Sequence, residues 1–459
     1  MTELVFNNDL IKKYDKSGPR YTSYPTAIQF AESFTEKDYL EQVKLSNERN
    51  TPLSLYFHIP FCDTICYYCG CNKIVTKNRS HAQPYLDAVY KELELQGSLF
   101  NATRIVRQLH WGGGTPTFIS HEQMTELMQQ TRRNFTLLDD DSGEYSIELD
   151  PREVDASSIK LLRKLGFNRI SLGVQDFNPK VQQAVNRIQS YKETRDVIIA
   201  ARNYKFHSIS LDLIYGLPFQ TVSSFSETVD RVLELEPDRL SVFNYAHLPE
   251  MFKTQRQINS ADLPSAESKL AILQHVTKKI IDAGYEFIGM DHFAKPGDEL
   301  AIAQKEKKLY RNFQGYSTNS DCDLVALGIT SIGKVADSYS QNIKTIPEYT
   351  EVIQSGRLPV FRGIRLTEDD VLRREVITQL ICHFELNFHE IEKQFSIDFS
   401  EYFSDEMNQL QEMKADSLLE LTIDKISVLP EGKLLIRNIC MVFDVYLKKN
   451  KQQRFSKTI

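Results

Sequence analysis

The chain has 459 residues, with 55 lysines and arginines against 62 aspartates and glutamates, so its formal net charge is −7. Hydrophobic residues make up 41% and charged residues 25%, which excludes collagen-like, coiled-coil and disordered classes. The acidic balance also argues against a protein that binds the phosphate backbone of nucleic acids.

The cysteines and the N-terminal sequence predict the compartment. Four of the seven cysteines crowd into positions 62, 66, 69 and 71, a distribution typical of ligation and not of a disulfide scaffold. The first residues lack the basic and apolar regions of a secretory signal, and no stretch approaches the roughly 18 apolar residues of a membrane helix. We therefore expect a cytoplasmic protein with reduced thiols and no membrane partner.

Apolar segments alternate with amphipathic segments between residues 53 and 290. The expected strands are 53–59, 105–111, 145–149, 169–174, 208–214 and 240–245. The expected helices are 83–100, 122–134, 157–165, 191–204, 224–236 and 267–283. Capping boxes are predicted at Ser120–Gln123 and at Ser224–Glu227, and Gly166 and Gly284 are expected to end helices in the left-handed conformation.

This alternation predicts an α/β protein built around a parallel sheet of six βα units, either an incomplete barrel or a strongly curved open sheet. The chemistry of such folds collects at the C-terminal ends of the strands. From about residue 366 the rhythm changes to helical patterns (368–382, 388–395, 403–416 and 434–447) with a β-like passage at 419–429. We predict an N-terminal extension (1–36), a catalytic domain (37–365) and a mainly helical C-terminal domain (366–459).

The cysteine motif follows the first expected strand directly, as Cys62-Asp-Thr-Ile-Cys66-Tyr-Tyr-Cys69. Three thiolates on a short loop can ligate an iron–sulfur cube and leave one iron open. The alternative is a zinc site closed by Cys71 as the fourth ligand. The short step from Cys69 to Cys71 favours three ligands and one free thiol.

The spacing Cys-x-x-x-Cys-x-x-Cys resembles the radical S-adenosylmethionine (SAM) enzymes. Further motifs resemble the oxygen-independent coproporphyrinogen III oxidases within that superfamily: Gly18-Pro-Arg-Tyr-Thr-Ser-Tyr-Pro-Thr26, Tyr56-Phe-His-Ile-Pro-Phe-Cys62, His110-Trp-Gly-Gly-Gly-Thr-Pro-Thr117, Glu148-Leu-Asp-Pro-Arg-Glu153, Gly173-Val-Gln-Asp-Phe177, Asp212-Leu-Ile-Tyr-Gly-Leu-Pro218, Met290-Asp-His-Phe293, Arg311-Asn-Phe-Gln-Gly-Tyr316 and Arg437-Asn-Ile-Cys440. The resemblance covers nearly the whole chain, which makes it far more specific than three cysteines.

The resemblance implies a radical SAM fold, a 4Fe-4S cluster on Cys62, Cys66 and Cys69, and two molecules of SAM. The residues implied for the two-SAM shell are Tyr56, Tyr68, Gly113, Gly114, Thr115, Glu148, Gln175, Arg187, Asp212, Ala246 and Ile332. Glu148 and Asp212 are candidates to hold ribose hydroxyls, and Arg187 is a candidate to face a carboxylate. Each of the three has a plainer interpretation, as a helix-capping carboxylate or a surface cation. Tyr56 and Cys71 are the further candidates for a catalytic role.

The activity implied is oxidative decarboxylation of two propionates of coproporphyrinogen III to vinyl groups, which gives protoporphyrinogen IX in haem biosynthesis under anaerobic conditions. The implied partners are a flavodoxin- or ferredoxin-type electron donor and an unidentified electron acceptor, and we expect a monomer. Two alternatives remain: a related haem chaperone or haem-degrading protein without oxidase activity, and a metal-stabilised binding module without turnover.

A substrate with four propionates requires local positive charge in an acidic chain. Arg20, Lys73, Arg311 and Lys334 stand in motif contexts and are the candidate cations, although each could equally be a solvated surface charge. Gly333 and Lys334 stand where the family usually has a serine and an uncharged residue. This segment is expected near the second SAM or the substrate, so the change could loosen the wall of that site or alter its charge. The N-terminal extension is open to two interpretations, a lid or a packing strap.

Overall fold

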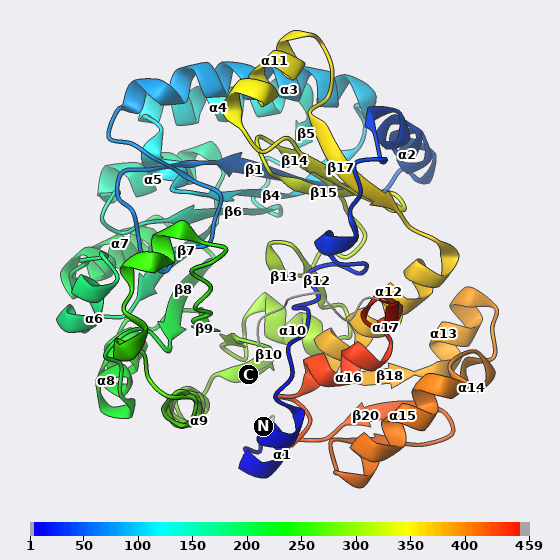
Figure 1. Ribbon diagram of the computed structural model, residues 1–459. Coiled ribbons are helices and arrows are strands. Elements are labelled where there is room, and N and C mark those ends of the chain that lie inside the picture. The colour runs from blue at the N-terminus through cyan, green and yellow to red at the C-terminus, as the bar shows by residue number, and fades with distance from the viewer. Residues whose placement is uncertain (1–3, 450–459) are drawn as a thin grey trace. The chain divides into compact units, whose positions relative to one another are not determined.

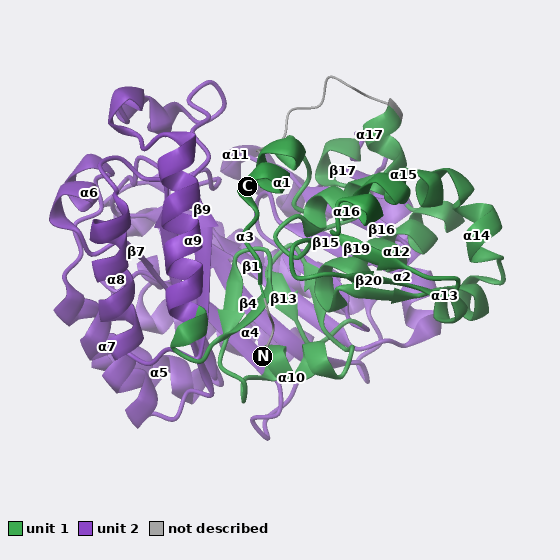
Figure 2. Cartoon of the chain, turned by 90° about the horizontal axis from the view of Figure 1, so that it is seen from below, with its two compact units in different colours: residues 1–29, 281–320, 366–459 green, residues 30–280, 321–365 purple. Residues whose placement is uncertain are grey.

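The computed structural model describes residues 4–449 and divides into two compact units, shown in separate colours in Figure 2. Unit 1 comprises residues 1–29, 281–320 and 366–459, and unit 2 comprises residues 30–280 and 321–365. Among the described residues, no helix is both long and apolar enough to cross a bilayer. The three functional parts predicted from the sequence (residues 1–36, 37–365 and 366–459) stay a prediction.

Unit 2 is built around a parallel sheet in the order β1-β4-β6-β7-β8-β9 (Figure 1). Its strands are β1 (Leu53–Ile59), β4 (Ile105–Gly113), β6 (Glu144–Leu149), β7 (Arg169–Gln175), β8 (Ser208–Tyr215) and β9 (Arg239–Asn244). Every neighbouring pair is parallel. The six predicted strands and the α/β class are thus confirmed, with ends shifted by at most two residues.

Burial explains why these segments form strands. All seven residues of β1 are buried except the half-buried Tyr56, as expected for a parallel strand covered on both faces. The side chains of Leu55 and Phe57 are fully buried. Apolar side chains alternate along β8, where Asp212 is one of the half-buried positions.

Helices connect these strands at the intervals expected for βα units. They are α2 (Glu36–Arg49), α3 (Ala82–Leu99), α4 (His121–Asn134), α5 (Ala156–Leu165), α6 (Pro179–Ala184), α7 (Tyr191–Asn203), α8 (Val222–Glu234) and α9 (Ala266–Asp282). The capping box at Ser120 and the left-handed Gly166 are confirmed. The box predicted at Ser224 is wrong: Thr221 caps α8, and Ser224 fills its third position.

Four further strands extend the sheet beyond β1, and they were not predicted. They are β14 (Asp323–Leu327), β15 (Ile332–Val335), β16 (Ser338–Asn342) and β17 (Val360–Arg365). The helix α11 (Ile346–Gln354) lies between β16 and β17 in the chain. β14 lies parallel to β1, and the next three are antiparallel. The two-residue strand β5 (Thr136–Leu137) pairs with the start of β4.

Unit 1 is mainly helical, as predicted for the C-terminal part. Its helices are α1 (Asn8–Tyr14), α10 (Glu299–Lys305), α12 (Glu368–His383), α13 (Phe388–Phe395), α14 (Phe399–Tyr402), α15 (Ser404–Ala415), α16 (Ile436–Val442) and α17 (Val445–Lys449). Its strands are β10 (Glu286–Gly289), β11 (His292–Ala294), β12 (Tyr310–Asn312), β13 (Gly315–Ser317), β18 (Glu385–Asn387), β19 (Leu419–Leu421) and β20 (Lys425–Val428). The expected β-like passage forms the antiparallel pair β19–β20, and the single helix expected at 434–447 is two short helices.

Candidate active site

The cysteine loop leaves the C-terminal end of β1 and is closed at its base by two short strands. β2 (Phe61–Cys62) pairs in parallel with β3 (Ile74–Val75), so the loop between them returns to its starting point. The Ile74 N–H donates to the Pro60 carbonyl at 2.7 Å, and the Thr76 N–H donates to the Cys62 carbonyl at 2.9 Å. This closure fixes both ends of the segment that carries the other three cysteines.

The middle of the loop is fastened by backbone contacts to neighbouring segments. The Tyr67 N–H donates to the Val185 carbonyl at 3.0 Å, and the Gln255 amide donates to the Tyr68 carbonyl at 3.0 Å. The Tyr67 and Tyr68 rings pack against a buried apolar cluster that includes Val185 and Tyr245. The loop is therefore held by the protein itself, which pre-positions its cysteines.

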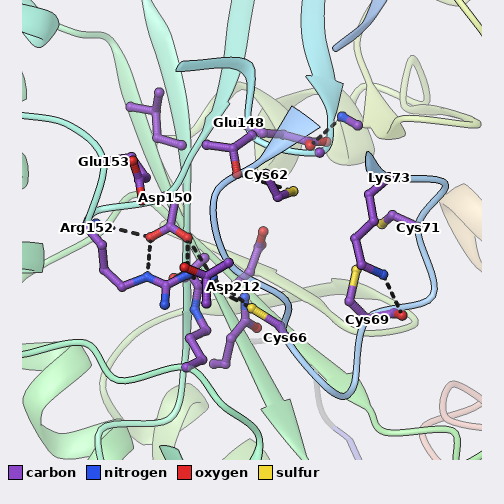
Figure 3. Close-up of a pocket in the computed structure, with 18 of the residues that line it drawn as sticks. Cys62, Cys66, Cys69, Cys71, Lys73, Glu148, Asp150, Arg152, Glu153 and Asp212 are labelled. Atoms are coloured by element: carbon purple, nitrogen blue, oxygen red, sulfur yellow. Dashed lines mark hydrogen bonds and ion pairs between the residues drawn. The ribbon is translucent and has the colours of Figure 1, made fainter. Parts of the chain in front are cut away.

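A pocket of about 340 Å³ opens beside this loop, at the C-terminal ends of the parallel strands (Figure 3). Of the residues predicted from sequence, the following line it: Cys62, Cys66, Tyr68, Cys69, Cys71, Lys73, Gly113, Gly114, Thr115, Glu148, Gln175, Arg187 and Asp212. Residues far apart in the sequence thus meet where the fold class places the chemistry.

The three cysteines predicted as ligands line this one pocket without converging on a single point. Among the described residues, no group of three His, Cys, Asp or Glu side chains is arranged to hold one metal ion. A closed zinc shell would require such convergence, whereas a cubane cluster binds each thiolate through a different iron. The donor set, three soft thiols around one cavity, fits a 4Fe-4S cluster.

The thiols differ in their electrostatic surroundings. Burial raises the pKa of Cys62 to about 11, although Thr115 donates a hydroxyl hydrogen bond to its sulfur at 3.6 Å. A hydrogen bond from Cys71, aided by the charge of Lys73, lowers the pKa of Cys69 to about 6. Lys73 also donates to the Cys69 carbonyl at 3.1 Å. Cys71 is exposed and acts on its neighbour as a donor.

Glu148 at the end of β6 is held by two protein donors. Nε2 of His110 donates to its Oε1 at 3.2 Å, and the Gly113 N–H donates to its Oε2 at 3.1 Å. Desolvation opposes the charge of this carboxylate, but the hydrogen bond and charge of His110 outweigh it and lower the pKa. Glu148 is thus an ionised acceptor, as a ribose-binding carboxylate would need to be.

The glycines beside Glu148 are required by close packing. Gly113 has φ +116°, and a Cβ there would lie 2.7 Å from the His58 ring. A Cβ on Gly114 would lie 2.6 Å from the Phe61 carbonyl oxygen. The turn after β4 therefore accepts only glycine. The Gly113 and Gly114 N–H groups donate to Glu148 and to the Ile59 carbonyl, so both are already used within the protein.

Two arginines meet at the sulfur of Cys66 and share one carboxylate (Figure 3). Nη1 of Arg187 lies 3.7 Å from Cys66 Sγ and 2.9 Å from Asp150 Oδ2. Nη2 of Arg152 lies 4.0 Å from the same sulfur and 2.6 Å from the same carboxylate oxygen. Burial alone would raise the pKa of Asp150, but Arg187 and then Arg152 hold it below its ordinary value. The arrangement delivers two cations to one cluster ligand.

Asp212 lies at a half-buried position of β8. It accepts a hydrogen bond from the Ser171 hydroxyl at 3.1 Å. Burial raises the pKa of Asp212 to about 6, against the lowering effect of hydrogen bonds from Ser241 and Ser171. With a pKa of about 6, the carboxyl is mainly ionised at neutral pH and can accept hydrogen bonds from a ligand.

Three predicted SAM-binding residues do not line this pocket. The Tyr56 hydroxyl lies 3.1 Å from Nδ1 of His58, and its ring stacks on His110 at 5.9 Å. The Ala246 carbonyl accepts from the Gln255 amide at 3.2 Å, and Ile332 begins β15. Their roles stay predictions. Of the remaining candidate cations, Lys334 lies in β15, and Arg20 and Arg311 belong to unit 1.

Several lining residues escaped the sequence analysis. They are Asp63, Thr64, Pro116, Leu149, Asp150, Arg152, Glu153, Ser171, Gly173 and Phe243. Asp150 and Arg152 fall inside the motif Glu148–Glu153, so the signal was present. Their role depends on contacts with Cys66 and Arg187, which sequence spacing does not reveal.

Comparisons with known proteins agree with this geometry. Residues 56–232 match the radical SAM superfamily, and residues 366–435 match the HemN C-terminal domain. The chain is 54% identical over 451 residues to an oxygen-independent coproporphyrinogen III oxidase of Pseudomonas aeruginosa, and 51% identical to that of Escherichia coli, with 98% of each chain covered. A solved structure of the Escherichia coli protein, described as coproporphyrinogen III oxidase (HemN) and as a radical SAM enzyme, has a TM-score of 0.93 and 48% identity. The match covers 97% of this chain and 100% of that one.

Proposed function

The chain belongs to the oxygen-independent coproporphyrinogen III oxidase family of radical SAM enzymes, and from that premise we propose how its residues perform the reaction. The enzyme is an oxidoreductase that converts two propionates of coproporphyrinogen III to vinyl groups without oxygen, giving protoporphyrinogen IX in haem biosynthesis. Each propionate loses one hydrogen atom, one carbon dioxide and one electron. The alternatives without oxidase activity are not favoured, since relatives at 51–54% identity over 98% of the chain carry the oxidase name.

Cys62, Cys66 and Cys69 would hold the 4Fe-4S cluster, and the fourth iron would remain open for SAM. When bound, the reduced cluster and SAM supply the radical that removes the hydrogen atom, and this chemistry is the cofactors' own. The protein contributes the positions of three thiolates on a closed loop, and the cations Arg152 and Arg187 beside Cys66. This convergence of thiols and cations in one pocket is the observation that carries the proposal.

The carboxylates at the strand ends would grip the polar parts of SAM. Glu148 is an ionised acceptor fixed by His110, and Asp212 lies across the same pocket. Tyr68, Gly113, Gly114, Thr115, Gln175 and Arg187 complete the predicted shell within this pocket. We propose Tyr56, Ala246 and Ile332 for the second SAM, because they lie outside the pocket that contains the cysteines.

Cys71 and Tyr56 are proposed for roles beyond binding. The Cys71 thiol lines the pocket that contains the three ligand cysteines, so we propose that it passes a hydrogen atom or an electron. Tyr56 stacks on His110, which in turn orients Glu148. The physiological setting we propose is a cytoplasmic monomer served by a flavodoxin- or ferredoxin-type donor and an unidentified acceptor, which suits seven unpaired cysteines.

Anaerobic reconstitution tests the function directly. The purified chain is loaded with iron and sulfide, reduced with dithionite, and given SAM and coproporphyrinogen III, and protoporphyrin fluorescence is read after oxidation. We expect brown protein and fluorescent product. Cys62→Ser should lose the cluster and the product, whereas Cys322→Ser, a buried cysteine outside the pocket, should keep both. Reconstituted wild-type protein that is colourless, or that cannot cleave SAM, would refute the proposal.

A further inference from the structure

Unit 1 brings together three arginines from segments far apart in the sequence. Arg20 lies in the N-terminal extension, Arg311 in β12 and Arg437 in α16. Arg437 donates through Nε to the Pro19 carbonyl at 2.8 Å and through Nη2 to the Gly18 carbonyl. Its guanidinium group is thereby fastened to the backbone directly before Arg20. We call these three residues the arginine cluster.

A second series of contacts joins Arg20 to Arg311. Arg20 pairs with Asp291 at 2.7 Å, and the next residue, His292, meets the Tyr316 ring edge-on at 5.1 Å. The guanidinium of Arg311 lies over that same ring, 4.7 Å from its centre. The loop between β10 and β11 and the β12–β13 hairpin thus set the arginines around one aromatic wall.

Arg311 is the member of the arginine cluster whose polar atoms are least satisfied. Arg311 is only 7% exposed, yet its Nε and Nη1 are buried without a hydrogen-bond partner among the described residues. Arg437 is 3% exposed. Burial and then the charges of Arg20 and Arg311 lower its pKa to about 10, against Asp291. Buried guanidinium nitrogens without a hydrogen-bond partner are costly, so the two such nitrogens of Arg311 favour binding of an anion.

We propose that the arginine cluster is a carboxylate-binding site that takes a propionate group of the tetrapyrrole substrate. The proposal rests on the proposed function, because it assumes that coproporphyrinogen III binds. Guanidinium groups bind carboxylates through directed N–H donors, and Arg311 presents two such nitrogens. The carboxylate of SAM shares this chemistry, and equilibrium binding of SAM distinguishes the two sources. The substrate carries four carboxylates for which the acidic chain must provide cations.

Binding of coproporphyrin III, the stable oxidised form of the substrate, to the reconstituted full-length enzyme tests the site by fluorescence quenching. Arg311→Gln removes the charge from a side chain whose Nε and Nη1 have no hydrogen-bond partner among the described residues. We expect its Kd for coproporphyrin III to rise about 10- to 100-fold, the range for one charged hydrogen-bonded contact. Arg311→Lys should recover part of the loss. Arg133→Gln, which changes a 63% exposed side chain, should bind like wild type.

Binding of a neutral ester and binding of SAM show whether the arginine cluster recognises a substrate carboxylate or the carboxylate of SAM. The neutral tetramethyl ester of coproporphyrin III should bind wild type and Arg311→Gln equally, because it has no carboxylate. Equilibrium binding of SAM should be unchanged in the variant; a loss of SAM binding with normal coproporphyrin binding would assign the site to SAM and overturn the proposal. Normal coproporphyrin affinity in Arg311→Gln would also overturn it. If circular dichroism shows that Arg311→Gln does not fold, the same binding measurements are made on Arg20→Gln. The Arg20 side chain belongs to the same cluster and is 35% exposed.

The outcome is distinguishable from failure of the proposed function. Wild-type turnover of coproporphyrinogen III tests the function, and the ratio of affinities between wild type and variant tests the site. A wild type that binds coproporphyrin III through Arg311 but forms no protoporphyrinogen would refute the activity and keep the site. In an active enzyme, we expect the variant to raise KM more than it lowers kcat.

Discussion

The two arginines at Cys66 lead to a quantitative prediction for the cluster. A unit charge at the 4.0 Å that separates Arg152 Nη2 from Cys66 Sγ interacts with a second unit charge by about 4 kcal/mol at an effective dielectric constant of about 20. The added electron is spread over the whole cluster, and Asp150 offsets part of the positive charge of Arg152. We therefore take about a quarter of this interaction energy, ~1 kcal/mol, as the effect of Arg152 on reduction. For a one-electron couple this corresponds to about 40 mV. Arg152→Gln should therefore lower the midpoint potential of the cluster by about 40 mV.

The measurement is an anaerobic redox titration of the reconstituted enzyme, followed by electron paramagnetic resonance of the reduced cluster. Asp150→Asn is the partner variant of opposite sign, because it removes the negative charge and leaves the guanidinium groups. We expect it to raise the potential. Arg107→Gln, at a 50% exposed side chain paired with Asp321, is the matched control and should leave the potential unchanged. Equal potentials in wild type and Arg152→Gln would refute the reasoning.

Three further predictions concern stability and turnover. Burial raises the pKa of Glu92 from 4.5 to about 7, so its stabilisation of the fold is complete below pH 4.5 and is lost as pH rises toward 7. Wild type should accordingly lose thermal stability relative to Glu92→Gln between pH 5 and 8 by about 3 kcal/mol, and a pH-independent difference would contradict this. Gly113→Ala should destabilise by about 1–3 kcal/mol in thermal unfolding, more than Gly356→Ala, which shares positive φ but meets no atom within 4 Å. Cys71→Ser should lower turnover while the iron content stays normal; full turnover would remove Cys71 from the mechanism.

The parallel strands could be predicted because each is a short segment with mainly apolar residues at its buried positions, continuous along β1 and alternating along β8. The cap of α8 was misplaced because Thr221 and Ser224 are both capping residues three positions apart, and only the backbone conformation decides between them. Asp150 and Arg152 stood in a recognised motif without a role. Arg152 contacts Cys66, 86 positions away, and Asp150 pairs with Arg187, 37 positions away, which no local pattern encodes.

The arginines at Cys66 and the arginine cluster of unit 1 differ in how far their charges are balanced. Arg152 and Arg187 share Asp150 and face a thiol that ionises when it ligates iron, so their charges are balanced within the chain and its cofactor. The arginine cluster of unit 1 has Asp291 on Arg20, while Arg311 keeps two buried nitrogens without a partner among the described residues. Because balanced charges gain little from an added anion and unbalanced ones gain much, coproporphyrin binding should weaken with salt through Arg311. The salt dependence should be smaller in Arg311→Gln than in wild type, and an identical dependence in both would show that the charge of Arg311 is compensated without the substrate.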